Sequence, residues 1–130
     1  MSGPQGWIGV DLDGTLAVYD GWVGPAHIGP PVPRMMNTVK QWLTEGQEVR
    51  IFTARVYPIN ECVSPDDVLR FVPTNARDRQ AVAALRAIQA WCRLHVGRVL
   101  PVTNVKDYGM VSLYDDRCVQ VRANTGELVE

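Results

Sequence analysis

Two carboxylates one residue apart are the first feature of this sequence that could do chemistry. Asp11 and Asp13 follow the apolar run Trp7–Val10 and come just before a turn at Gly14 and Thr15. In an extended segment, residues i and i+2 point the same way, so both carboxylates can face one pocket. Two like charges this close need a cation, and carboxylate oxygens favour a hard ion such as Mg²⁺. One carboxylate can then act as a nucleophile and the other as an acid and base; the alternative is an Asp-rich turn that caps a helix.

Three further polar signals follow apolar runs later in the chain. Thr53 comes after one such run, Lys106 lies shortly after a second, and Asp115 and Asp116 end a third. The carboxyl ends of parallel strands meet at one edge of a sheet, so we expect these side chains to lie near Asp11. Taken singly, each signal has an ordinary alternative. The Thr could cap a helix, the Lys could be a solvated loop residue, and the acidic pair could form a turn.

This layout resembles the haloacid dehalogenase superfamily of phosphohydrolases. The four motifs of that family are DxDxT, a Thr or Ser after the second strand, a Lys, and a closing acidic pair, and the sequence matches all four in order. The resemblance covers most of the chain and implies one Rossmann-like α/β domain over residues 1–130. That fold has a mainly parallel sheet with helices on both faces. The implied activity is Mg²⁺-dependent hydrolysis of a phosphomonoester through an aspartyl-phosphate intermediate.

The resemblance also implies a role for each motif. Asp11 is expected to attack phosphorus, and Asp13 to protonate the leaving oxygen and then to activate water. Thr53 and Lys106 complete the expected catalytic set. The residues expected to bind the substrate are Gly14, Thr53, Ala54, Arg55 and Lys106. The residues expected to bind the metal are Asp11, Asp13 through its backbone carbonyl, Asp115 directly, and Asp116 through water or by orienting the Lys.

Two arginines indicate which members of this superfamily the chain resembles most. Arg55 directly follows Ala54 in Thr-Ala-Arg, and an Arg at that position can form a bidentate contact with a phosphate. Together with Arg117 in Tyr-Asp-Asp-Arg, this pattern resembles the phosphatase domain of phage-type polynucleotide kinases, which acts on nucleic-acid 3′-phosphates. Those domains also use a basic residue in the loop after the first motif, where this chain has only His27. A polynucleotide 3′-phosphate, a nucleotide and another small phosphate ester therefore stay open as substrates.

Residues 17–33 are expected to form a loop, because Gly and Pro are frequent there. The resembling family carries a flap over the active site at this point, so Trp22, Val23 and His27 could reach a substrate. The alternative is a surface loop that Trp22 pins to the fold. Neither gap between the motifs is large enough for the inserted cap domain of many family members. Such an open site suits a large substrate, or it uses a neighbouring copy in a homo-oligomer as its lid.

Periodicity predicts the elements that position these residues. Apolar runs predict strands at about 7–12, 48–53, 98–102, 110–114 and 118–122. Helical spacing of apolar residues predicts helices at 34–45 and 76–96. A turn at 123–127 predicts a hairpin, through which the chain end would add an antiparallel edge to the sheet.

Composition limits the class of protein. With 130 residues, of which 46 % are hydrophobic, the chain can bury one core but not two. The net charge of −1 produces no overall field that would attract nucleic acid or a membrane. Because we find no signal-peptide pattern and no run of transmembrane length, we expect a cytoplasmic protein without a membrane partner. Cys62, Cys92 and Cys118 lack CxxC spacing and are expected to be reduced thiols.

Two other functions compete with the phosphatase. A haloacid dehalogenase would share the fold, but such enzymes usually lack the second Asp, so Asp13 argues against this activity. A non-catalytic module that binds phosphate or a partner would keep the same polar positions without turnover. An assay with and without Mg²⁺ separates this module from the enzyme.

Overall fold

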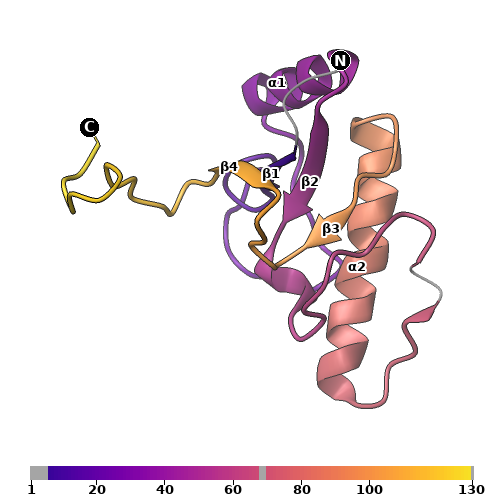
Figure 1. Cartoon of the computed structure of the whole chain (residues 1–130). Helices are drawn as coiled ribbons and strands as arrows, with labels where there is room; N and C mark the ends of the chain where they lie inside the picture. The colour runs from indigo at the N-terminus through magenta and orange to yellow at the C-terminus, as the bar shows by residue number, and fades with distance from the viewer. Residues whose placement is uncertain (1–5, 68–69, 130) are drawn as a thin grey trace.

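A parallel sheet forms the centre of the molecule (Figure 1). The computed structural model describes residues 6–67 and 70–129. Within them, the sheet has four strands in the order β3-β2-β1-β4, and every pairing is parallel. The strands are β1 (Trp7–Asp11), β2 (Glu48–Phe52), β3 (Val102–Thr103) and β4 (Met110–Tyr114). The α/β class and the mainly parallel sheet are therefore confirmed.

Two α-helices and a short 3₁₀ helix connect these strands in the described chain. Helix α1 (Pro33–Thr44) joins β1 to β2, and η1 (Ala54–Val56) and α2 (Ala76–His95) lie between β2 and β3. Pro33 starts α1, where its missing N–H leaves no hydrogen bond unmade. Helix α2 begins after Asn75, whose side chain accepts a hydrogen bond from the first turn. The described parts of both connections hold no inserted cap domain, in agreement with the short gaps in the sequence.

The hydrophobic core lies between one face of the sheet and both helices. Val10, Ile51 and Val102 are neighbours in register on three adjacent strands, and all three are buried. They belong to one cluster with Val39 of α1 and Leu85 of α2. This arrangement differs from the predicted placement of helices on both faces. The connections through α1 and α2 cross the sheet in the same direction, and right-handed crossovers in one direction leave their helices on one face.

The chain between β3 and β4 covers the opposite face. Strand β3 lies beside the carboxyl end of β2, and β4 begins beside the amino end of β1. The connection between them therefore crosses the sheet from one edge of the strands to the other. On this path the Asp107 carboxylate accepts a hydrogen bond from the Trp7 indole at 2.8 Å. The Arg50 guanidinium lies 3.5 Å from the same carboxylate and 4.5 Å from the centre of the Trp7 ring. These contacts bury Trp7 without a second helix layer.

Two predicted strands differ from the structure. The strand expected at 98–102 is reduced to the short β3, since Pro101 has no N–H to donate to a neighbouring strand. Residues 118–122 are not a strand of the sheet, and the chain end, yellow in Figure 1, leads away from it. The predicted hairpin forms only an isolated bridge between Val121 and Leu128. Both side chains are exposed, so burial does not favour a paired edge here.

The cysteines are all free thiols in the described chain, in agreement with the prediction. Cys62 is half-buried, Cys92 is buried and Cys118 is exposed. Burial raises the pKa of Cys92 to about 11, which makes this thiol unreactive. Neither α1 nor α2, the described helices, has the length and apolar character needed to cross a membrane.

The assignment of the core face of α2 can be tested with two leucines. Leu85→Ala is expected to lower the free energy of unfolding by about 2–5 kcal/mol, because the side chain is fully buried. Leu94→Ala on the same helix is the matched control. Leu94 is 76 % exposed, so this change should lower the free energy of unfolding by no more than about 0.5 kcal/mol. Urea denaturation measures both values. Equal losses would contradict the assigned face.

Candidate active site

Polar residues from three neighbouring strands meet at one edge of the sheet. Asp11 ends β1, Thr53 directly follows β2 and Asp115 directly follows β4. Because β1 pairs with both β2 and β4, the ends of these strands lie side by side. All three residues line one pocket of about 620 Å³. The structure thus brings together residues that are far apart in the sequence.

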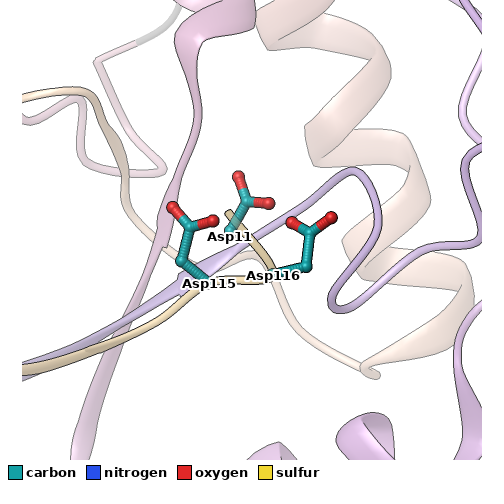
Figure 2. A group of neighbouring side chains, drawn as sticks. All are labelled: Asp11, Asp115 and Asp116. Carbon is teal, nitrogen blue, oxygen red and sulfur yellow. The ribbon is translucent and has the colours of Figure 1, made fainter. Parts of the chain in front are cut away.

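Three carboxylates converge in this pocket. Oxygen atoms of Asp11, Asp115 and Asp116 lie within 4.8 Å of one another, and Figure 2 shows the three groups on the same side of the strand ends. Burial, the charge of Asp115 and a hydrogen bond with Asp116 raise the pKa of Asp11 from 3.8 to about 7. Carboxylates at this spacing repel one another unless a proton or a cation joins them. Their oxygen atoms are the ligands that a hard divalent cation such as Mg²⁺ prefers, so the residues fit the predicted metal.

The turn after β1 holds Asp116 in place. The Thr15 hydroxyl accepts a hydrogen bond from the Asp116 backbone N–H at 3.0 Å and donates one to the Asp116 carboxylate at 3.3 Å. Gly14 has a φ of +88°, and a Cβ at this position would overlap the same carboxylate. The sequence predicts that Gly14 lets the backbone approach a phosphate. In the structure its missing side chain makes room for Asp116.

Thr53 both caps a helix and lines the pocket. Its hydroxyl accepts a hydrogen bond from the Arg55 backbone N–H at 3.1 Å, at the start of η1. The helix-cap alternative is therefore realised. A hydroxyl can accept and donate at once, so this buried group keeps a hydrogen to donate into the pocket, which Ala54 also lines.

Arg55 binds Asp13. Its Nε and Nη2 atoms donate to the two carboxylate oxygens at 2.7 and 2.9 Å, and its side chain is only 6 % exposed. The Nη1 atom donates to the carbonyl oxygens of Gly24 at 3.3 Å and Pro25 at 3.1 Å. The Trp22 ring lies 5.0 Å from the guanidinium carbon. The Asp13 carboxylate is thus paired with a cation, whereas the other three carboxylates of the pocket face one another.

Lys106 is the predicted site residue that lies apart from the others. It is exposed in the connection between β3 and β4, outside the pocket lining, and forms no ion pair within residues 6–67 and 70–129. Desolvation and the charge of Asp115 raise the pKa of Cys118, and the charge of Lys106 acts against them.

The loop between β1 and α1 borders the pocket. Its base is closed by a bridge between Ala17 and Pro31. Of the three loop residues considered from the sequence, Trp22 lines the pocket, and Val23 and His27 do not. Hydrogen bonds from Arg55 to the loop backbone attach this segment to the site.

Four residues of the pocket lining whose side chains carry polar groups are absent from the predicted site. They are Tyr19, Tyr57, Arg77 and Gln80. Two of them come from the beginning of α2, one follows η1, and one belongs to the loop after β1. A usable signal exists only for the α2 pair, because parallel sheets direct the amino ends of the following helices toward the ligand. Arg117, which the sequence does single out, also lines the pocket.

No protein-family model, curated protein or solved structure matches this chain. The chemistry of the pocket is therefore inferred from its own residues. These residues supply three carboxylates suited to a cation, a fourth held by an arginine, and a buried hydroxyl with a hydrogen to donate. Such a set can bind a divalent cation beside an anionic ligand.

Crowding of the carboxylates predicts an effect on stability. Asp11→Asn is expected to raise the melting temperature of the metal-free protein at about pH 8, because one of the mutually repelling charges is lost. The pKa of Asp11 rises from 3.8 to about 7 on folding, so the folded state binds the proton more tightly. The stability that the native Asp11 contributes therefore falls as the pH rises between these two values.

Thermal unfolding in a chelator, at about pH 5 and about pH 8, checks this prediction. The gain from Asp11→Asn should be larger at the higher pH. Asp20→Asn is the matched control, because Asp20 is exposed and lies outside the pocket. An equal gain at both pH values would contradict the prediction.

Proposed function

We propose that this protein is a Mg²⁺-dependent phosphomonoester hydrolase that forms an aspartyl-phosphate intermediate. The observation that carries the proposal is the approach of Asp11, Asp115 and Asp116 to within 4.8 Å at the strand ends. The same pocket contains Asp13 and Thr53, two further residues that the motif order selects. The cytoplasm is the proposed compartment, since it keeps free thiols such as these reduced.

Asp11 is the nucleophile in this proposal. Its carboxylate oxygen forms a bond to phosphorus while the bond from phosphorus to the leaving oxygen breaks, and the leaving oxygen takes up a proton. Water then attacks phosphorus, the bond to Asp11 breaks, and inorganic phosphate is released. Asp11, Asp115, Asp116 and the Asp13 carbonyl would hold Mg²⁺, which would supply positive charge that offsets the carboxylates and the phosphoryl oxygens. Without it, the raised pKa of Asp11 leaves much of the nucleophile protonated at neutral pH.

Asp13 transfers the protons in both steps. It protonates the leaving oxygen first and then accepts a proton from the attacking water. Pairing with Arg55 keeps both oxygens of Asp13 as acceptors, which suits the second step. The first step requires this pair to loosen. An incoming phosphoryl group offers the guanidinium another anion, so the phosphate-binding role predicted for Arg55 and the observed pairing are two positions of one side chain.

Thr53 donates its hydroxyl hydrogen to a phosphoryl oxygen, and its buried position at the end of β2 fixes the direction of that bond. Lys106 stays a prediction from the motif, because its ammonium group lies outside the pocket lining. The Lys106 side chain is long and exposed, so movement toward a bound anion needs no rearrangement of the core.

Hydrolysis of a small aryl phosphate tests the proposal. The parent protein is expected to require Mg²⁺, and Asp11→Asn is expected to lose at least about 1,000-fold in kcat, because an amide is a poor nucleophile. Asp20→Asn should keep the parent rate. Phosphate binding without turnover at any Mg²⁺ concentration would contradict the proposal and would indicate the non-catalytic module instead.

The positioning role of Arg55 gives a separate prediction. Arg55→Lys is expected to lower kcat more than it raises KM and to change the pH dependence of kcat, because one ammonium group cannot hold both oxygens of Asp13. Arg93→Lys, an exposed change in α2, is the control and should alter neither. A rise in KM alone, with the parent pH profile, would assign Arg55 to substrate binding only.

A further inference from the structure

The pocket is larger than a phosphoryl group requires. Its volume of about 620 Å³ lies within the range of about 300–1,000 Å³ that is typical of sites for whole small molecules. Two groups of side chains in its lining differ in chemistry. One is the set of carboxylates with Thr53, and the other is a set of aromatic, basic and amide side chains that we call the wall: Tyr19, Trp22, Tyr57, Arg77, Gln80 and Arg117. The first group has its role in the proposed hydrolysis, and the second has none there.

The aromatic side chains of this wall are not used to build the fold. Tyr19, Trp22 and Tyr57 are 44 %, 57 % and 53 % exposed, and none of them belongs to the hydrophobic core cluster. Large exposed apolar surfaces that line a concave site mark places where a ligand binds. These rings therefore offer planar surface to whatever is attached to the phosphoryl group.

Arginines lie against two of the rings. The Arg55 guanidinium lies 5.0 Å from the centre of the Trp22 ring, and the Arg77 guanidinium lies 5.3 Å from the centre of the Tyr57 ring. A cation on one face of a ring orients it and leaves the other face for stacking. Arg77 and Gln80, three residues apart near the beginning of α2, add hydrogen-bond donors to the same pocket lining.

We propose that the wall formed by Trp22, Tyr57 and Arg77 binds a nucleobase, so that the substrate is a nucleoside monophosphate. This proposal rests on the proposed hydrolase function. A nucleobase has π-faces that stack on aromatic rings and polar edges that accept hydrogen bonds from donors such as Arg77 and Gln80. A sugar phosphate without a base would leave the wall uncovered.

A polynucleotide fits the observations less well than a mononucleotide. Single-stranded nucleic acid needs a basic track that follows its backbone beyond the reacting end. The chain has a net charge of −1, and Arg55, the most buried arginine of the pocket lining, is already paired with Asp13. The arrangement therefore favours one base and one phosphate in a single pocket.

Direct binding tests the nucleobase site independently of catalysis. The probes are adenosine 5′-monophosphate and ribose 5-phosphate, titrated into the Asp11→Asn protein with Mg²⁺ in a calorimeter. The nucleotide is expected to bind at least about tenfold more tightly, since stacking of a base on an aromatic ring has this magnitude. Adding Tyr57→Ala should remove most of the difference, and Tyr57→Phe should retain it. Tyr108→Ala is the matched control, because Tyr108 is fully exposed and outside the pocket lining.

Each outcome decides a different question. Equal affinity for the two probes would overturn the nucleobase site, even if the parent protein hydrolyses both. A preference for the nucleotide that depends on Tyr57 supports the site, even if the parent protein shows no hydrolysis and the proposed function fails. A third outcome is that a 3′-phosphorylated oligonucleotide binds more tightly than the mononucleotide and that Tyr57→Ala does not change this. The pocket would then bind the end of a nucleic acid, and the nucleobase site would be rejected.

Discussion

Repulsion between carboxylates at adjoining strand ends is the constraint on which the site depends. Parallel pairing of β1 with β4 places Asp11 beside Asp115, and the turn at Gly14 and Thr15 brings Asp116 to the same point. Burial, together with the charges of Asp115 and Asp116, raises the pKa of Asp11 to about 7. Three carboxylates held this close together favour the binding of a proton or a cation between them.

The fourth carboxylate of the pocket lies in a different electrostatic environment from the other three. Asp13 has its own cation in Arg55, and among the causes that raise the pKa of Asp11 the charge of Asp13 is the smallest. In the proposed reaction, a shared external cation would suit the carboxylates that hold and attack the phosphoryl group, whereas a fixed internal partner would suit the carboxylate that exchanges protons. Asp11 and Asp13 are two residues apart in the sequence and have the same side chain. The residues around each of them therefore cause the difference between their environments.

The strand ends could be predicted from the sequence because their signal is local. Asp11, Thr53 and Asp115 each end or follow an apolar run, and parallel sheets gather such positions at one edge. The pairing of Arg55 with Asp13 could not be predicted, because it depends on how η1 and the first loop fold against each other. The same limit applies to the helices: which face they cover follows from the order of the strands, and no local pattern encodes that order. Residues 118–122 have the composition of a strand but no buried face to pack against.

The four side-chain hydrogen bonds of Arg55 are divided equally between the loop and the acid: two go to the carbonyl groups of Gly24 and Pro25, and two go to Asp13. One guanidinium group therefore joins the loop that borders the pocket to the Asp13 carboxylate. Displacement of this part of the loop would remove half of the hydrogen bonds that orient the guanidinium. In the proposed reaction, access to the pocket and proton transfer by Asp13 would therefore depend on the same side chain, without any motion of the sheet.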